Sequence, residues 1–248
     1  MFQTFFYKPV VNLLIFLYDI IPGHDIGLTI LIFVVIVKIV LHPLQKKAIT
    51  SQKALQEIQP EIEELKKKYK DDKQELGKAT LELYKEKKIN PFSSCLPLLI
   101  QLPFLIAIFR LFRTGFTDNN IFNLTYSFVS APETINPITL GFVDLSQPGN
   151  ILLSVLAGGA LYVQTKMMMA RKPEQKKNPN PNETENMMNI MNKQMLYMMP
   201  VFVAYISYTT PSGLALYWFV FTYLTVVQQY FLFKKRDEDS IEVIKKQN

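Results

Sequence analysis

The chain of 248 residues is 49% hydrophobic and only 19% charged, with a formal charge of +6 at pH 7. The charges are confined to blocks separated by long apolar runs, which indicates an all-α polytopic membrane protein rather than a soluble domain with one core. The single cysteine, Cys95, excludes an internal disulfide and a multi-cysteine metal site. The histidines and glycines form no catalytic, metal-binding or phosphate-binding motif. We therefore expect no enzyme activity, no metal and no cofactor.

Residues 1–22 are predicted to form an amphipathic helix that lies in the membrane interface on the outer face. Apolar residues recur there at helical spacing, which is typical of a surface-bound helix. The polar residues that oppose them are Gln3, Lys8, Asn12 and Asp19. A cleaved signal peptide fits less well, because the segment lacks a basic n-region and a small-residue cleavage site.

The first transmembrane helix is predicted at residues 23–45, and it contains Lys38. At about 1.5 Å per residue, Lys38 lies about 16 Å into a hydrocarbon core about 30 Å thick. A lysine at that depth costs about 2.5–3.5 kcal/mol on insertion scales, so other groups are expected to offset it. Lys38, His42 and Gln45 are spaced at i, i+4 and i+7, which predicts a polar stripe on one helical face.

Residues 46–89 are predicted to fold into a cytoplasmic helical hairpin. Apolar residues at alternating spacings of three and four, typical of a coiled-coil seam, run through both arms, with a turn at residues 70–72. Pro60 is expected to kink the first arm or to begin a new helix. The many charges are most simply a solvated face, and a docking surface is the alternative.

The remaining segments complete a predicted set of five transmembrane helices. In chain order they are a second span (90–113), an extracytoplasmic loop (114–150), a third span (151–170), a cytoplasmic loop (171–194), a fourth span (195–210), a fifth span (211–233) and a basic cytoplasmic tail (234–248). In the third span, the small residues at 157–160 are suited to close helix packing.

The distribution of lysine and arginine predicts the orientation. The hairpin, the 171–194 loop and the tail are basic, whereas residues 114–150 contain no lysine or arginine. By the positive-inside rule, the N-terminus lies outside and the C-terminus in the cytoplasm of a cell membrane. Basic residues beside spans also favour anionic lipid over nucleic acid as their partner.

Polar side chains of four predicted spans fall in the cytoplasmic half of the membrane, where they must face protein or water. We therefore predict a hydrophilic groove, open to the cytoplasm and closed on the outer side. The candidate groove residues are Lys38, Gln101, Gln164, Trp218, Thr222, Thr225 and Gln229. Taken singly, the two glutamines are also consistent with interhelical hydrogen bonds and Trp218 with ordinary packing.

Snorkelling of Lys38 to the cytoplasmic interface is the alternative to a hydrated groove. Side chains on a helix lean toward its N-terminus, which for this span is outside. The ammonium is therefore expected to lean away from the nearer, cytoplasmic interface. This argument favours the groove.

Four sequence runs closely resemble the YidC/Oxa/Alb family of membrane protein insertases, in its short form. They are LHPLQKKAITSQKALQEIQPEIEELKKKY, NPFSSCLPLLIQLPFLIAIF, NKQMLYMMPVF and SGLALYWFVFTYLTVVQQY, in the family's order. The resemblance implies a five-helix core, a cytoplasmic hairpin, an outer amphipathic helix and a positively charged groove that receives segments of new membrane proteins. The family's first span typically carries arginine, whereas Lys38 keeps the charge without the planar, bidentate fork.

The resemblance implies an insertase and chaperone without a chemical step. Lys38 would attract a short polar segment of a nascent membrane protein, and the substrate's apolar helix would leave into lipid along apolar or Met-rich surfaces. The implied partners are nascent membrane proteins, membrane lipids, and the ribosome and targeting factors through the hairpin and the basic tail. Participation of a Sec-type translocon stays open.

Two other functions remain as alternatives. One is a small-solute or ion transporter that uses Lys38 as its binding charge, although we find no internal repeats with broken helices at matched positions. The other is a lipid-organising protein in which Lys38 binds an anionic headgroup.

Overall fold

The computed structural model describes residues 3–69, 72–90, 96–114, 124–130, 132, 134–169 and 194–247. Most of these residues are helical, as expected, and the described strands form one short antiparallel β-hairpin. The elements are η1 (Gln3–Tyr7), α1 (Lys8–Ile20), α2 (Ile26–Glu57), α3 (Gln59–Lys68), α4 (Lys73–Glu86), α5 (Leu96–Thr114), β1 (Ile138–Thr139), β2 (Val143–Asp144), α7 (Ile151–Met169), η3 (Gln194–Met198), α9 (Met199–Thr209) and α10 (Ser212–Gln247).

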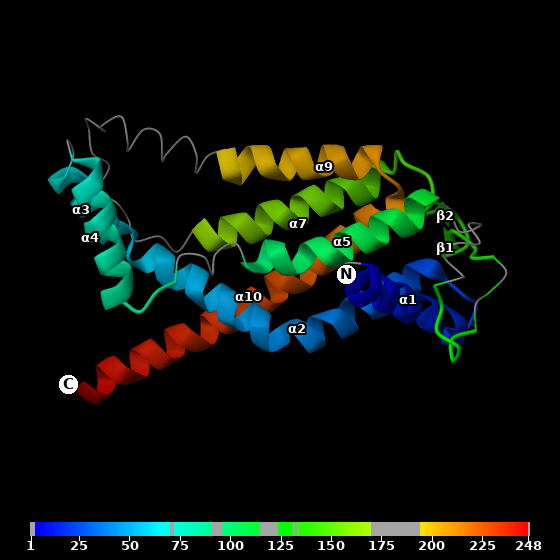
Figure 1. Cartoon of the computed structure of the whole chain (residues 1–248), viewed down its shortest axis with the longest axis horizontal. Helices are drawn as coiled ribbons and strands as arrows, with labels where there is room; N and C mark the ends of the chain where they lie inside the picture. Colours follow the sequence, from blue (N-terminus) through cyan, green and yellow to red (C-terminus); the bar gives the residue numbers. More distant parts are fainter. Residues whose placement is uncertain are drawn as a thin grey trace.

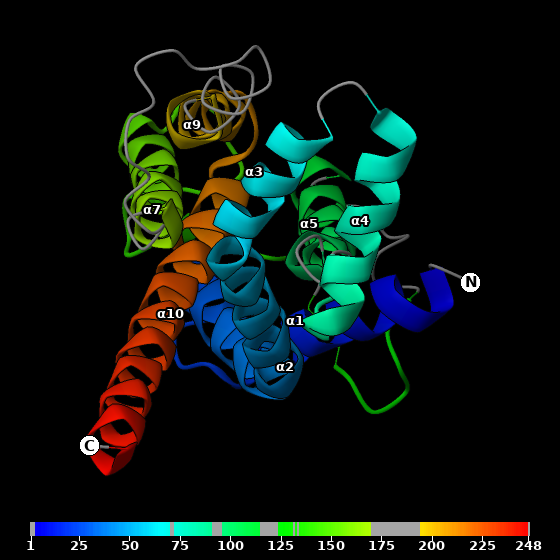
Figure 2. The ribbon, with the colours of Figure 1, turned by 90° about the vertical axis from the view of Figure 1, so that its left-hand side faces the viewer.

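Five helices, α2, α5, α7, α9 and α10, run along the long axis of the molecule (Figure 1). The hairpin of α3 and α4 lies at one end, together with the C-terminal end of α10. Helix α1 and the β1–β2 hairpin lie at the opposite end, where α1 crosses the bundle axis (Figure 2). The segments predicted to be cytoplasmic and extracytoplasmic therefore lie at opposite ends wherever the structure describes them.

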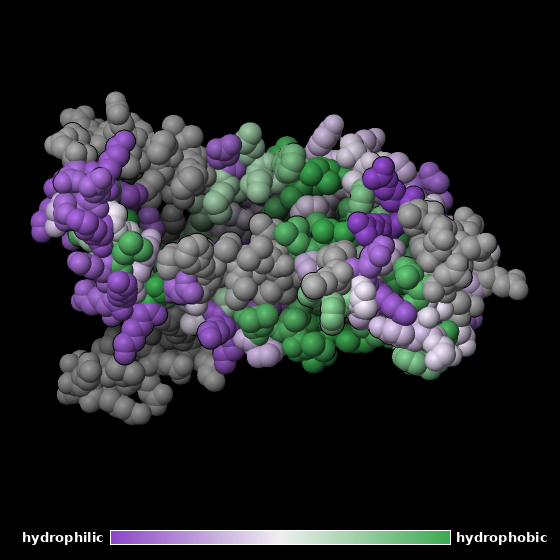
Figure 3. Space-filling model, in the orientation of Figure 1, coloured by the Kyte–Doolittle hydropathy of each residue, from purple (hydrophilic) through white to green (hydrophobic). Residues whose placement is uncertain are grey.

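Within the described residues, three helices are long and apolar enough to cross a membrane, namely Ile26–Leu55, Ile151–Met169 and Ser212–Lys234. Apolar surface gathers over the middle of the molecule, and hydrophilic surface covers the α3–α4 end (Figure 3). This distribution is that of a membrane protein. The other two predicted spans correspond to α5 and to α9, which has 11 residues and follows η3.

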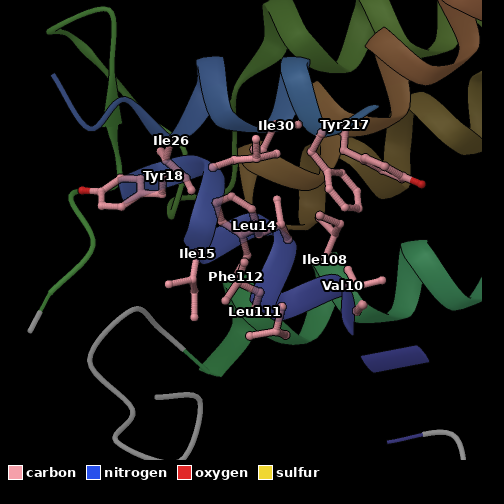
Figure 4. Close-up of a cluster of buried hydrophobic side chains, with 14 of the residues drawn as sticks. Val10, Leu14, Ile15, Tyr18, Ile26, Ile30, Ile108, Leu111, Phe112 and Tyr217 are labelled. Carbon is pink, nitrogen blue, oxygen red and sulfur yellow. The ribbon is translucent and has the colours of Figure 1, made fainter. Parts of the chain in front are cut away.

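The largest apolar core closes the end of the bundle at which α1 lies. Side chains from α1 pack there against α2, α5 and α10 (Figure 4). The labelled members of this core are Val10, Leu14, Ile15, Tyr18, Ile26, Ile30, Ile108, Leu111, Phe112 and Tyr217. Because α1 covers this end, the space between the long helices is filled with apolar side chains there.

Asn12 does not lie on a solvated face of α1, so that part of the sequence prediction is wrong. Its side chain is 3% exposed. Its Nδ2 donates to the carbonyl oxygen of Leu124 at 3.0 Å, and its Oδ1 accepts from the backbone N–H of Tyr126 at 2.6 Å. A buried amide that makes such bonds satisfies backbone groups of an irregular segment, and here it attaches that segment to α1.

The predicted boundary between the first span and the hairpin, at residue 45, is not a helix end. Helix α2 continues to Glu57 and contains Pro43. It continues because Ala48 and Ile49 are buried, the latter against Met168 and Phe233 of neighbouring helices. The break comes at Ile58 instead, and α3 then begins with Pro60 in its first turn, where proline is tolerated.

Residues 137–149, which we call the β-strap, connect the ends of several long helices. At one side the Asp25 carboxylate, directly before α2, accepts hydrogen bonds from Thr139 Oγ1 at 2.5 Å and from the N–H of Leu140 at 2.8 Å. Burial raises the pKa of Asp25, but these bonds and one from the N–H of Leu28 hold it below its usual value. A Cβ at Gly27 would lie 2.8 Å from Thr139 Cβ, so this approach requires glycine.

The other side of the β-strap is bonded to α9 and α10. The N–H of Ser212 donates to the Gln147 carbonyl oxygen at 3.0 Å, and the N–H of Gly213 donates to the Leu145 carbonyl oxygen at 2.8 Å. The N–H of Gly149 donates to the carbonyl oxygen of Tyr208 at 2.8 Å. The β-strap was predicted only as part of an extracytoplasmic loop, and its strands pair Ile138 with Asp144.

The small residues of α7 allow a close approach to α9 at one point. A Cβ on Gly158 would lie 2.7 Å from the Pro200 carbonyl oxygen and 2.8 Å from Ala204 Cβ, whereas one on Gly159 would meet nothing within 4 Å. The prediction of close packing is therefore confirmed for Gly158 and is wrong for its neighbour.

Candidate functional site

A cavity of about 360 Å³ lies among α2, α5, α7, α9 and α10. All seven candidate groove residues line it. They are Lys38 on α2, Gln101 on α5, Gln164 on α7, and Trp218, Thr222, Thr225 and Gln229 on α10. Four helices that are distant in the sequence thus bring their polar side chains to one space.

Lys38 is held inside this cavity by two acceptors and an aromatic ring. Its side chain is 8% exposed. Its Nζ donates to Thr225 Oγ1 at 2.5 Å and to Gln45 Oε1 at 3.0 Å, and it lies 3.9 Å from the centre of the Phe221 ring. The hydroxyl of Thr225 in turn donates to the Phe221 carbonyl oxygen at 2.8 Å. An ammonium in this position is solvated by protein groups, which offsets the cost of burying its charge.

The prediction that the Lys38 side chain leans toward the N-terminus of its helix is wrong. Gln45 lies about 10 Å farther along the helix axis, toward the C-terminus of α2. Since the Nζ reaches Gln45 Oε1, the side chain extends toward the α3–α4 end and not toward the helix N-terminus. The acceptors on Gln45 and Thr225 outweigh the usual lean of helical side chains. The ammonium nevertheless stays buried, so it does not snorkel to the surface.

Lys38 and Thr225 meet because two helices begin at the same level. Lys38 is the thirteenth residue after Asp25, and Thr225 is the thirteenth after Ser212. Asp25 and Ser212 are both bonded to the β-strap, and α2 and α10 run from it in the same direction. At about 1.5 Å per residue, both side chains lie about 20 Å from the β-strap.

Three buried amide atoms in the cavity have no hydrogen-bond partner within the described part of the chain. They are Gln45 Nε2, Gln101 Oε1 and Gln229 Oε1. The Nε2 of Gln101 does donate to the hydroxyl of Tyr217 at 2.7 Å, which fixes the orientation of that amide. Buried polar groups normally find a partner, so these atoms are available to water or to a bound polar segment.

The lining residues that were not among the candidates include Gln45, Gln52 and Phe221. Lys38, Gln45 and Gln52 follow one another at seven-residue intervals, which keeps them on one helical face. This signal was present in the sequence, but residue 52 was assigned to the hairpin. His42, which was predicted to share the stripe, is instead exposed and hydrogen-bonded to Gln228 at 3.2 Å.

The two sides of the cavity differ in polarity. Helices α2 and α10 contribute the ammonium, hydroxyls and most of the amides, whereas α5, α7 and α9 contribute mainly apolar side chains. The apolar lining residues of these three helices are Leu102, Leu105, Leu161, Met199 and Val203. Among the lining residues that the structure describes, none carries a carboxylate, so the charge of Lys38 is not neutralised by a counter-ion.

No group of three or more histidine, cysteine, aspartate or glutamate side chains in the described ranges could hold a metal ion. The lining residues can supply hydrogen bonds and the charge of one ammonium. The site can therefore bind and orient an anionic or polar group next to an apolar surface.

Comparison with known proteins identifies the family. Residues 16–239 match the family model described as 60Kd inner membrane protein. A protein of Fusobacterium nucleatum named membrane protein insertase YidC is 36% identical over 212 residues, which are 85% of this chain and 87% of that protein. Proteins of the same name from Magnetococcus marinus (29% identical) and Actinobacillus pleuropneumoniae (30% identical) match 95% and 98% of this chain.

The chain spans little more than a third of those two longer relatives, 36% and 39% of their lengths respectively. The match to the Fusobacterium nucleatum protein covers most of both chains. Together with the family model, it confirms the resemblance found in the sequence. The chain belongs to the 60Kd inner membrane protein family, which includes these proteins named membrane protein insertase YidC.

Proposed function

We propose that the chain is a membrane protein insertase and that the Lys38 cavity is its binding site for polar segments of nascent membrane proteins. The observation that carries this proposal is a buried ammonium whose cavity, in the described part of the chain, is lined by no carboxylate but by amides and hydroxyls from four helices. Such a charge is retained at a cost inside a membrane, and intramembrane charges generally mark functional sites. The names of the relatives support the same function.

In this proposal five helices span the membrane, α5 and α9 included. The α3–α4 end is cytoplasmic, and the α1 end lies outside a plasma membrane. The distribution of lysine and arginine and the apolar closure around α1 support this orientation. The cavity then opens toward the cytoplasm as a groove.

Lys38 attracts an acidic group of the substrate's short outer segment. An ion pair at 4 Å is worth about 4 kcal/mol at an effective dielectric constant of 20. That attraction is comparable to the cost of about 2.5–3.5 kcal/mol for placing an aspartate at the centre of the membrane. The free amide atoms of Gln101 and Gln229 hydrate or bind the remaining polar groups. No chemical step is involved.

The substrate's apolar helix leaves into lipid along the apolar side of the cavity. Met199 lines that side, and α9 continues it outward with the exposed side chains of Val201, Phe202 and Tyr205. Met-rich surfaces adapt to partners of different shapes. The substrate's own hydrophobicity supplies the driving force, with a contribution from the membrane potential.

The α3–α4 hairpin and the C-terminal part of α10 extend from the proposed cytoplasmic end, where they can contact a ribosome or a targeting factor. The hairpin surface is highly charged and carries exposed ion pairs, such as Lys87 with Glu61 at 2.7 Å. The tail begins with the basic run 234–236, which suits ribosomal RNA phosphates. Membrane lipids are partners throughout, and a Sec-type translocon is an additional candidate.

Site-specific photocrosslinking to a ribosome-bound, single-span nascent chain tests the function. Crosslinkers at positions 38, 101 and 218 should capture the chain, and capture should disappear when its apolar segment is made polar. A crosslinker at Leu152, which is 69% exposed on α7 and outside the cavity, is the control. Absence of crosslinks, with the protein folded and the chain targeted, would refute this function and favour solute transport, which predicts solute uptake by vesicles.

Lys38→Ala tests the role of the charge separately. We expect insertion of substrates with acidic outer segments to fall, and insertion of those with neutral segments to continue. Lys166→Ala is the matched control, because Lys166 is an exposed lysine near the end of α7 that does not line the cavity. Normal insertion of acidic substrates by folded Lys38→Ala would remove Lys38 from the mechanism.

A further inference from the structure

The turn between β1 and β2 exposes three apolar side chains. Phe142 is 80% exposed, Leu140 is 75% exposed and Ile138 is 43% exposed. They stand within five consecutive residues, at the tip of a hairpin whose other face packs on α2. Isolated apolar residues are common on protein surfaces, but a cluster at an ordered tip indicates a contact with an apolar partner.

The conformation of the turn is unfavourable for the residue that it contains. Leu140 has φ 53° and Gly141 has φ 81°, so both are in the left-handed region. Thr139 pairs with Val143, so the loop between the strands holds three residues, and the N–H of Phe142 donates to the Thr139 carbonyl oxygen at 3.3 Å. Leu140 and Gly141 are the two central residues of this turn, where positive φ at both positions favours Asn-Gly or Asp-Gly, because leucine rarely adopts positive φ. The hydrogen bond from the N–H of Leu140 to Asp25 Oδ2 holds the turn in place. The sequence thus places an apolar side chain where folding alone would favour a polar one.

The depth of the turn follows from its attachments. The β-strap is bonded to Asp25, directly before the spanning helix α2, and to Ser212 and Gly213 at the start of the spanning helix α10. The turn therefore lies at the level at which these helices enter the membrane. That level is the boundary between headgroups and acyl chains, where partly exposed apolar and aromatic side chains are stable.

Helix α1 lies at the same end of the molecule (Figure 1). It and the preceding η1 also expose apolar side chains. Phe16 and Ile20 of α1 are 44% and 55% exposed, and Phe6 of the preceding η1 is 48% exposed. This face is the one left for lipid, since the opposite face of α1 is buried in the core. A contact of the β1–β2 turn with this membrane surface would therefore adjoin the contact expected for α1.

We propose that the β1–β2 turn, through Ile138, Leu140 and Phe142, inserts into the lipid interface at the α1 end of the bundle and fixes the depth of α2 and α10. Because Lys38 and Thr225 each lie about 20 Å from the β-strap, an anchored turn sets the depth of the Lys38 site. The proposal rests on the membrane spans of these two helices and not on insertase activity.

Fluorescence quenching of a single tryptophan tests the insertion. The chain has one tryptophan, so Trp218→Phe gives a background without any. Phe142→Trp in that background places a reporter of similar size at the tip. Gly77→Trp is the aqueous control, because Gly77 is exposed on the hydrophilic hairpin and nothing lies within 4 Å of its Cβ position. Lipid nanodiscs leave both membrane faces accessible to a soluble quencher.

We expect lipids brominated near the headgroup to quench the indole introduced by Phe142→Trp, and iodide to quench it several-fold less than the indole introduced by Gly77→Trp. Strong iodide quenching at the tip without quenching by brominated lipid would place the turn in water and overturn the proposal. Protection from both quenchers would show that protein covers the turn, as a second copy of the chain would, and would also overturn it.

A second reporter keeps the test decisive should Phe142→Trp fail to fold. Ile138→Trp reports on the same tip, and it can be combined with Leu140→Asn and Phe142→Ser. Leu140→Asn suits the turn, since asparagine is favoured at positive φ, and Phe142→Ser replaces an exposed side chain. We expect the fluorescence of the Ile138→Trp reporter to shift to longer wavelength and its iodide quenching to rise several-fold when both changes are made. An unchanged spectrum would contradict an insertion that these side chains drive.

Discussion

Replacing Thr225 by valine removes the hydroxyl that lies 2.5 Å from the Lys38 ammonium while keeping the shape of the side chain. Hydrogen bonds to charged groups are worth about 1.5–3 kcal/mol, and Thr225 is 9% exposed. In a Lys38→Met background the same hydroxyl serves only the Phe221 carbonyl oxygen. The double-mutant cycle should therefore give a coupling free energy of about 1.5–3 kcal/mol between Lys38 and Thr225.

Equilibrium unfolding in mixed micelles with increasing SDS, followed by the fluorescence of Trp218, measures the four free energies of this cycle. Thr210→Val is the matched control, because the hydroxyl of Thr210 makes the same local bond, to Ile206 at 2.8 Å, outside the cavity. Distant substitutions add within about 0.3–0.5 kcal/mol, so its coupling with Lys38→Met should fall in that range. An equally small coupling for Thr225 would refute the view that this hydroxyl stabilises the buried charge.

Two further predictions concern packing and pH. Gly158→Ala should destabilise the protein by about 1–3 kcal/mol, because its Cβ would overlap α9. Gly159→Ala should not destabilise it, since its Cβ would meet nothing within 4 Å. Equal thermal midpoints for the two variants would contradict this packing of α7 on α9. Asp25 has a lowered pKa, so its charged form stabilises the fold above its ordinary pKa of 3.8 and that contribution is lost as the pH falls below this value. Asp25→Asn should thus lower the thermal midpoint at pH 7, and the difference from the parent should shrink between about pH 5 and pH 3; a difference independent of pH would exclude the carboxylate as its cause.

Local periodicity was enough to predict seven of the residues that line the cavity. The spacing of Trp218, Thr222, Thr225 and Gln229 puts them on one face of any helix. Lys38 is recognisable as a candidate because it is a charged residue within a long apolar segment, whatever the other helices do. These signals depend only on residues close in the sequence. The same reasoning identified the small residues of α7, but it could not show which of two adjacent glycines meets α9.

Predictions that depended on an unseen neighbour failed. Asn12 is polar at a helical spacing that suggests solvent, yet an irregular segment more than a hundred residues away supplies backbone partners for it. The end of the first span was placed at a change of composition, whereas α2 continues because Ile49 finds an apolar contact on α7 and α10. Neither partner can be inferred from the local pattern.

By itself, the sequence determined that the protein is helical and membrane-bound, to which family it belongs, and that Trp218, Thr222, Thr225 and Gln229 share one helical face. The tertiary structure decided what the Lys38 ammonium contacts and in which direction it points. The physical reason is that helix periodicity and hydropathy arise within a few turns of chain. The position of a buried charge is decided by acceptors on another helix, and here the β-strap fixes the level of both helices.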